Sequence, residues 1–534
     1  PRQPGPYHHE PVAEWRRAGV RAAFAAAVEH RQTSVDGGGP LDVAAVIDGH
    51  EVHTRQTIAS VDPAEPGRVV ATSASCGPDE ADRAVEVASR AWEKWSRTPT
   101  RERAAVLFRL AEWMRARRND LATLEIFEAG KPWAEADADV CEAIDFCEYY
   151  GREMIDLDRR GRVESPPGET NRLTYQSRGV GVVIAPWNFP LAIPTGMVTG
   201  ALVAGNPVIL KPAEQAPAVA SMLVEGLAAA GVPPGVVGFL PGVGEVVGAH
   251  LVAHPGVSFV VFTGSKDVGL TINAAAAQHR PGQRQVKRVV AEMGGKNAVV
   301  VDADADLDQA VPAVVRSAFT YAGQKCSAAS RLIVVEPVVD ELLSRLSGAV
   351  AELSIGHPRH MATDVGALID SDAQNRVRAY TEMARAQGRI VLHREDVPAS
   401  GYFAGPLVVA DVAPDSPLAR EEIFGPVLAV LRASSFDEAV AFANDTDYAL
   451  TAGVFSRSPA NIALASNELR AGNVYVNRGI TGAVVGRQPF GGHGLSGTGS
   501  QAGGPDYLLQ FVDPRVTTEN TLRRGFAPDG PAGA

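Results

Sequence analysis

Short runs of β-branched residues alternate with helical patterns along the middle of the chain, and this alternation is the strongest constraint on its fold. The runs occupy residues 182–184, 208–210, 236–240, 257–262 and 299–301. Between two of them, residues 216–230 carry a helical pattern that Gly231 ends. Strands separated by helices of this length indicate βαβ units in a parallel sheet. A second set begins at Asp306, so we expect two α/β domains with ligands beyond the carboxyl ends of their strands.

One stretch of the chain imitates a membrane span. No Asp, Glu, Lys or Arg occurs from Gly179 to Leu210. A membrane helix needs about 20 consecutive, mostly apolar residues, but four prolines and several glycines divide this stretch. We therefore predict a buried strand, loop and helix, and no association with a membrane.

The net charge and the number of cysteines exclude some classes of protein. The chain has 62 acidic residues against 50 Lys and Arg, a formal charge of −12, which argues against a nucleic-acid binder. Four cysteines in 534 residues, with no C-x-x-C pair, exclude a disulfide scaffold and suit a reducing compartment. The first forty residues contain no apolar run typical of a secretory signal. We therefore expect a cytoplasmic protein.

Two strand-to-helix turns are candidate cofactor sites, although the usual dinucleotide fingerprint is absent. The nearest G-x-G-x-x-G candidate, residues 242–248, has its third glycine one position late. Gly264 and Ser265 follow a predicted strand and could offer backbone N–H groups to a pyrophosphate, or simply cap a helix. Lys211 and Glu214 follow another strand, where the carboxylate could accept both hydroxyls of an adenine ribose. A solvated ion pair is the alternative for these two.

The segment with the clearest chemistry is a loop containing Cys326. The thiol lies among small and polar residues between a predicted helix and a strand, a setting that favours a reactive thiolate over a core cysteine. Glu292 ends the predicted strand 286–291 and could act as a general base. A solvated glutamate is the alternative.

Taken together, these motifs resemble the aldehyde dehydrogenase superfamily over nearly the whole chain. Seven landmarks follow the family's order. They are Pro186-Trp187-Asn188-Phe189-Pro190, Lys211-Pro212-Ala213-Glu214, Phe262-Thr263-Gly264-Ser265, Glu292-Met293-Gly294-Gly295-Lys296, Gly323-Gln324-Lys325-Cys326, Glu421-Glu422-Ile423-Phe424-Gly425-Pro426 and Pro489-Phe490-Gly491-Gly492. The resemblance implies a Rossmann-like NAD domain, an α/β catalytic domain and a small β oligomerisation element.

The resemblance also implies the chemistry of the site. Cys326 would be the nucleophile, Asn188 the side-chain donor to the oxyanion and Glu292 the base that activates water. NAD would be the cofactor, with NADP disfavoured by Glu214, and no metal is expected. The implied cofactor residues are Ile184, Pro186, Lys211, Glu214, Gly244, Gly264, Ser265, Glu422 and Phe424.

Within the superfamily, three segments are most similar to members that oxidise L-glutamate γ-semialdehyde, the open form of 1-pyrroline-5-carboxylate, to L-glutamate. They are residues 323–331, 477–486 and 488–492. Gly482, Ala483 and Ser327 would then bind the α-carboxylate, Phe189 and Phe490 would enclose the carbon chain, and Glu142 would lie near the amino group.

The resemblance divides the chain into four parts. Residues 1–54 would be an N-terminal extension with a packing or assembly role. Residues 55–159 and 181–293 would form the NAD domain, and residues 294–495 the catalytic domain. A hairpin at 160–180 and a C-terminal tail at 496–534 would form the oligomerisation element. A homodimer or a higher homo-oligomer is expected.

Two alternatives stay open. Another aldehyde dehydrogenase, for succinic semialdehyde or an aliphatic aldehyde, would share Cys326, Glu292 and Asn188, but a dicarboxylate site would more plausibly use an Arg. A non-catalytic NAD-binding protein would keep the fold without the chemistry, but all three of these residues are present.

Overall fold

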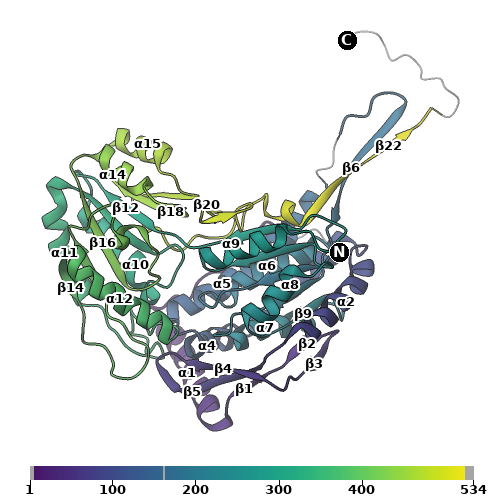
Figure 1. The fold of residues 1–534 in the computed structure, drawn as a ribbon, viewed down its shortest axis with the longest axis horizontal. Helices are drawn as coiled ribbons and strands as arrows, with labels where there is room; N and C mark the ends of the chain where they lie inside the picture. The colour runs from purple at the N-terminus through teal and green to yellow at the C-terminus, as the bar shows by residue number, and fades with distance from the viewer. Residues whose placement is uncertain (1–4, 160–162, 523–534) are drawn as a thin grey trace.

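Two large sheets organise the molecule (Figure 1). The computed structural model describes residues 5–159 and 163–522. The first sheet has eight strands in the order β21 (Gly497–Thr498), β11 (Arg288–Glu292), β10 (Phe259–Thr263), β7 (Gly181–Ile184), β8 (Val208–Lys211), β9 (Val237–Phe239), β2 (Ala45–Ile47) and β3 (His50–Val52). Strands β11 to β9 run parallel, and the three outer strands are antiparallel to their neighbours.

The second sheet has seven strands, of which six run parallel. Their order is β14 (Arg389–His393), β15 (Leu407–Ala410), β16 (Val427–Ala433), β13 (Ala329–Val335), β12 (Asn297–Val301), β18 (Thr451–Phe455) and β19 (Asn473–Val476), with β14 antiparallel at one edge. Each large sheet has its own buried apolar cluster. The α/β fold with two parallel sheets, predicted from the alternation of strands and helices, is confirmed.

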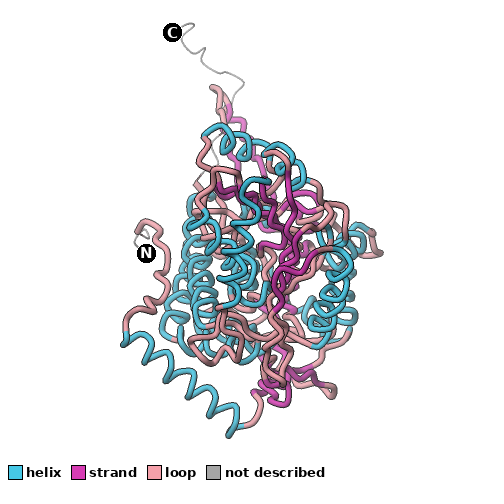
Figure 2. The backbone as a smooth tube through the Cα atoms, turned by 90° about the vertical axis from the view of Figure 1, so that its left-hand side faces the viewer, coloured by secondary structure: helices cyan, strands magenta, loops and turns pink. Residues whose placement is uncertain are grey.

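Helices cover the sheets on both sides, as the tube view shows (Figure 2). Those before β11 are α1 (Ala18–Gly38), α2 (Pro78–Trp95), α3 (Thr100–Ala116), α4 (Arg118–Glu128), α5 (Trp133–Leu157), α6 (Ala192–Val203), α7 (Pro217–Ala229), the π-helix η1 (Gly244–Gly248), α8 (Ala249–Ala253) and α9 (Lys266–Ala277). Those after it are α10 (Leu307–Phe319), the 3₁₀ turns η2 (Thr320–Gly323) and η3 (Glu336–Val338), α11 (Val339–Ala351), α12 (Ser371–Gln387), α13 (Pro417–Arg420), α14 (Phe436–Asn444), α15 (Pro459–Glu468) and the 3₁₀ turn η4 (Tyr507–Phe511).

The charge-free stretch folds as the buried strand β7, a turn, the helix α6 and the buried strand β8. Eleven residues of α6 are buried, so a charged side chain there would lose its hydration without gaining a partner. Burial inside the protein therefore explains why residues 179–210 carry no charge, and no membrane is needed to explain it. None of the described helices combines the length and the apolar character that crossing a membrane requires.

Three small β units complete the fold. One sheet contains β1 (Leu41–Val43), β5 (Glu65–Ala74) and β4 (Thr57–Asp62), and a second pairs β17 (Tyr448–Ala449) with β20 (His493–Gly494). In the third, β6 (Glu169–Ser177) pairs with β22 (Val512–Asn520) in a ribbon that projects from the body at the upper right of Figure 1.

The structure differs from the expected segment boundaries in three places. Strands within residues 45–52, expected in an extension, join the eight-stranded sheet through β9, and β21 from the expected tail joins its other edge. Within the predicted hairpin at 160–180, the described residues 163–180 contain one strand, β6, whose hydrogen bonds are made by the C-terminal β22. Local patterns show that a strand is present but do not identify a partner hundreds of residues away. Residues 1–4, 160–162 and 523–534 lie outside the described part.

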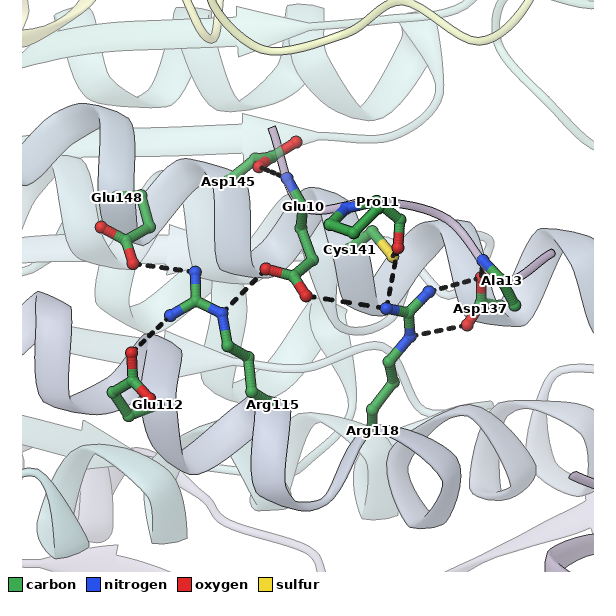
Figure 3. A network of polar contacts seen from close by, with 10 residues as sticks. All are labelled: Glu10, Pro11, Ala13, Glu112, Arg115, Arg118, Asp137, Cys141, Asp145 and Glu148. Carbon is green, nitrogen blue, oxygen red and sulfur yellow. Dashed lines mark hydrogen bonds and ion pairs between the residues drawn. The ribbon is translucent and has the colours of Figure 1, made fainter. Parts of the chain in front are cut away.

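Charged hydrogen bonds tie the N-terminal segment to helices α3, α4 and α5 (Figure 3). The backbone N–H of Glu10 donates to Asp145 at 2.7 Å, and Arg115 donates to the Glu10 carboxylate at 2.8 Å. Arg118, which binds Asp137 through two nitrogens at 2.7 and 2.8 Å, also donates to the Pro11 carbonyl oxygen at 2.9 Å. Bidentate pairs of this kind fix orientation as well as adding attraction. The N-terminal segment is therefore an integral part of the helical layer.

Candidate active site

The loop that carries Cys326 is held in an unusual backbone conformation. Tyr321, Ala322 and Gly323 have φ angles of 55°, 54° and 70°, a left-handed turn that costs about 1–2 kcal/mol for each residue with a Cβ. A side chain at Gly323 would place its Cβ 2.5 Å from the Gly425 carbonyl oxygen. Glycine is therefore required at this position, and the turn directs the chain into the thiol-bearing loop.

Asn297, the first residue of β12, holds the other side of this loop. Its amide nitrogen donates to the carbonyl oxygens of Cys326 at 2.6 Å and Ala328 at 2.9 Å. Its oxygen accepts the N–H of Thr451 at 3.0 Å. One buried side chain thus connects the starts of β12 and β18 to the loop that carries the nucleophile. Asn297 was not predicted from the sequence, because an Asn at the start of a strand has no distinctive pattern.

Two cavities meet at Cys326. The first is mostly apolar, and the second lies at the carboxyl ends of the parallel strands of the eight-stranded sheet. Cys326, Ile193, Thr263 and Met293 line both. A thiol at this junction can react with a molecule in one cavity while a second molecule occupies the other.

The three predicted catalytic residues surround this junction. Asn188, in the turn between β7 and α6, is 5% exposed and donates its amide to the Gln324 carbonyl oxygen at 3.1 Å. It lines the second cavity beside Cys326. Glu292 ends β11, lines the first cavity beside the thiol and accepts the N–H of Gly492 at 3.3 Å. Gln324 was also missed, because its contribution is a backbone carbonyl.

Both proton-transfer groups favour their neutral forms in this chain. Burial raises the pKa of the Cys326 thiol to about 12, and the Glu422 and Glu292 carboxylates reinforce the shift. Burial also raises the pKa of Glu292 well above its usual range, opposed by the hydrogen bond from Gly492. A positive charge brought into the second cavity would stabilise the thiolate, so a cationic ligand there would activate the nucleophile.

All six predicted substrate residues line the first cavity. They are Glu142, Phe189, Ser327, Gly482, Ala483 and Phe490. Glu142, on α5, provides a second carboxylate beside Glu292 in this mostly apolar pocket, and burial together with Asp139 raises its pKa to about 8. Walls of this composition suit a short aliphatic molecule with polar ends.

The predicted cofactor residues fall into two groups. Pro186, Gly264, Ser265, Glu422 and Phe424 line the second cavity. Ser265 caps α9, accepting the N–H of Val268 at 3.4 Å, so the positive end of this helix faces the cavity. Glu422 accepts the N–H of Gly295 at 3.0 Å.

The other four predicted cofactor residues lie outside that lining, at the ends of neighbouring strands. Ile184 and Lys211 are paired across β7 and β8. Lys211 binds Glu214 at 2.7 Å, and the same carboxylate oxygen accepts the N–H of Gly244 at 2.7 Å. This carboxylate beyond a parallel strand has the chemistry to accept ribose hydroxyls. Together with the α9 terminus, these residues fit an elongated dinucleotide such as NAD.

The described residues contain no group of three His, Cys, Asp or Glu side chains placed to hold a metal ion.

Comparison with protein families and curated proteins gives consistent matches. The profile of the aldehyde dehydrogenase family matches residues 50–517. The 1-pyrroline-5-carboxylate dehydrogenase of Geobacillus kaustophilus is 48% identical over 514 residues, which is 96% of this chain and 99% of that protein. That of Geobacillus thermodenitrificans is 47% identical over the same coverage.

Solved structures match equally well. A mutant of Thermus thermophilus 1-pyrroline-5-carboxylate dehydrogenase has a TM-score of 0.95 and 43% identity over 97% of this chain and 100% of its own. The same scores and coverage hold for a Thermus 1-pyrroline-5-carboxylate dehydrogenase with bound NAD. Proline utilization A from Bdellovibrio bacteriovorus has a TM-score of 0.96 and 46% identity. The match covers 99% of this chain but 55% of that longer protein.

Proposed function

The chain belongs to the aldehyde dehydrogenase family, and from this premise we propose that it oxidises L-glutamate γ-semialdehyde, the open form of 1-pyrroline-5-carboxylate, to L-glutamate with NAD. The observation that carries the proposal is the position of Cys326, where an aldehyde cavity lined by the Glu142 and Glu292 carboxylates meets a cofactor cavity. The names of the most similar relatives support the same substrate.

In the first step the Cys326 thiol loses its proton to solvent, and the thiolate attacks the aldehyde carbon, forming a C–S bond while the C=O π bond breaks to leave an oxyanion. The Asn188 amide and the backbone N–H of Cys326 would donate hydrogen bonds to this oxyanion. One such donor contributes roughly 3 kcal/mol in comparable sites. Because Asn188 is already anchored on the Gln324 carbonyl, little reorganisation is needed when the charge develops.

The second cavity would hold NAD, which would supply the hydride acceptor needed to oxidise the thiohemiacetal on Cys326 to a thioester. Gly264, Ser265 and the α9 terminus would hold its pyrophosphate, and Lys211 and Glu214 its adenine ribose. Glu422 would bind the nicotinamide ribose, with Phe424 beside the ring.

In the second step Glu292, in its ionised form, takes a proton from water. The water oxygen adds to the thioester, the C–S bond breaks, and the acid leaves with the thiol restored. The hydrogen bond from Gly492 stabilises the ionised carboxylate. The cysteine thus separates oxidation from hydrolysis.

Substrate recognition follows from the first cavity. The N–H groups of Gly482 and Ala483 and the Ser327 hydroxyl would bind the α-carboxylate, and ionised Glu142 the ammonium group. Phe189 and Phe490 would enclose the carbons between these ends. A simple aliphatic aldehyde uses none of the polar groups.

The test of this proposal is the initial rate of NADH formation with pyrroline-5-carboxylate, succinic semialdehyde and propanal at equal concentrations. We expect a kcat/KM preference of about 100-fold for the first, equivalent to about 2.7 kcal/mol. Equal rates would reject the amino-acid substrate while leaving the cysteine chemistry in place.

Glu214→Gln should weaken the preference for NAD over NADP. The substitution removes the charge that repels a 2′-phosphate and frees the Lys211 ammonium, which Glu214 now binds at 2.7 Å. We expect the NAD to NADP ratio of kcat/KM to fall about tenfold, or about 1.4 kcal/mol. Steady-state kinetics with both cofactors measures this, and an unchanged ratio would contradict the role given to Glu214.

Assembly and location complete the proposal. The β6–β22 ribbon stands away from the body in Figure 1 with most of the side chains of β22 exposed. Such a ribbon can add strands across a two-fold axis, so we propose at least a homodimer. All four cysteines are free, consistent with a cytoplasmic enzyme.

A further inference from the structure

A fully buried lysine behind the aldehyde cavity has no role in the mechanism above. Lys131 lies between α4 and α5 and is 0% exposed. Its ammonium group is 2.5 Å from the Asp139 carboxylate and 3.4 Å from Glu125. Removing a lysine ammonium group from water costs free energy unless the group is paired. Its burial next to the site therefore indicates that it contributes to the site.

The ammonium group also lies against two aromatic rings of the site. It is 4.1 Å from the centre of the Phe189 ring and 5.5 Å from that of Tyr321, within the range of cation–π attraction. Phe189 is a wall of the aldehyde cavity. Tyr321 begins the left-handed turn toward Cys326, and its hydroxyl donates to the Ala129 carbonyl oxygen at 2.8 Å. One cation therefore contacts both the substrate wall and the approach to the nucleophile.

The Asp139 carboxylate, which pairs with Lys131, also binds the chain close to Asn188, the proposed oxyanion donor. One oxygen of Asp139 binds Lys131, and the other accepts the N–H of Ala192 at 2.7 Å. Ala192 is the first residue of α6, four positions after Asn188. The Lys131–Asp139 pair therefore contacts the segment that presents Asn188 at two points, the Phe189 ring and the α6 end.

Lys131 also acts on the charge of Glu142. Burial and the carboxylates of Asp139, Asp145 and Glu135, all on α5, raise the pKa of Glu142, whereas the Lys131 ammonium lowers it. Across the cavity, Glu292 and Cys326 favour their neutral forms. Lys131 thus favours the ionised carboxylate that a substrate ammonium would need.

We propose that Lys131 is a positioning residue that gives the cavity its selectivity for an amino-acid aldehyde. It holds the Phe189 ring and the Tyr321 turn in place, and its charge favours ionised Glu142. The inference rests on the proposed function for the identity of the substrate. It adds a residue that touches neither substrate nor cofactor.

Lys131→Met tests this role. We expect the ratio of kcat/KM for pyrroline-5-carboxylate to that for propanal to fall at least tenfold at pH 7.5. In the wild type this ratio should rise with pH as Glu142 ionises. In the variant the rise should move to higher pH, because the cation that favours ionisation is gone. The same substrate preparations serve both enzymes, so their own pH dependence cancels.

Lys287→Met is the matched control. Lys287 is also buried, at 7% exposed, but it donates to the Val252 carbonyl oxygen, away from both cavities. We expect this control to lose thermal stability without a change in the substrate ratio.

If Lys131→Met does not fold, Lys131→Met/Asp139→Asn replaces the ion pair by neutral groups and keeps an oxygen for the Ala192 N–H. Because Asp139→Asn also removes a carboxylate that raises the pKa of Glu142, the pH dependence of the double variant should stay close to that of the wild type, whereas the loss of the Phe189 and Tyr321 contacts should still lower its substrate ratio.

The outcomes separate the two proposals. A wild-type enzyme without preference for pyrroline-5-carboxylate would reject the proposed function and this inference with it. If the wild type shows the preference and a folded Lys131 variant retains it, with both substrates slowed equally, the role of Lys131 is only structural and the inference is overturned.

Discussion

Replacing Cys326 by alanine is expected to abolish turnover while leaving NAD binding intact. No other described side chain that lines both cavities can act as a comparably strong nucleophile, since the others are Ile193, Thr263 and Met293. Loss of a nucleophile in a comparable covalent enzyme costs about 10⁶-fold in kcat, so we expect a fall of at least about 10⁵-fold. The NAD dissociation constant, measured by calorimetry, should change less than threefold, because other residues hold the cofactor.

Cys147→Ala is the matched control for this variant. Cys147 is fully buried in α5, is absent from the lining of both cavities, and burial likewise raises the pKa of its thiol. We expect its turnover to stay close to that of the wild type. Substantial activity in Cys326→Ala would contradict the assignment of the nucleophile.

Glu292→Gln should separate the two chemical steps. Attack and oxidation do not need this carboxylate, but hydrolysis of the thioester does. We therefore expect a first burst of about one NADH per site, followed by a steady rate about 10²–10⁴-fold below that of the wild type. Rapid mixing measures the burst, and mass spectrometry of the quenched enzyme detects the acyl group on Cys326.

Glu225→Gln provides the comparison for Glu292→Gln, because Glu225 is exposed on α7, away from both cavities. It should show neither burst nor slowing. If Glu292→Gln lacks the burst and carries no acyl group, Glu292 acts before the thioester forms, and its role as the hydrolytic base is wrong.

The sequence alone predicted the features that depend on local pattern. The alternation of strands and helices predicted two parallel sheets, and chain order placed Glu292 at a strand end and Cys326 in the loop before β13. Parallel sheets bring the carboxyl ends of their strands together, so Glu292, Lys211 and Ser265, which end or follow strands of the first sheet, could be expected to converge on one edge. Cys326 precedes β13 of the second sheet, so this argument does not predict its approach to that edge.

The features that the sequence did not predict depend on distant partners. Asn297 and Lys131 have no periodic signature, and their roles follow from contacts with the Cys326 loop and with Phe189. The pairing of β6 with β22 joins residues more than 300 positions apart. The residues near a strand in the sequence do not indicate which strand it pairs with, because the alternation of side chains between the two faces is the same for any partner.

The pairing of β11 with β21 also determines when, during synthesis of the chain, the active site can be completed. Glu292 pairs with Gly497 across these strands and accepts a hydrogen bond from Gly492, 200 residues later in the chain. At bacterial and eukaryotic translation rates this separation takes about 10–40 s to synthesise. During that interval the ribosome-bound chain exposes an unpaired sheet edge and an unfinished pocket around the reactive thiol. Assistance from chaperones would therefore matter most late in synthesis, when most of the chain has already emerged.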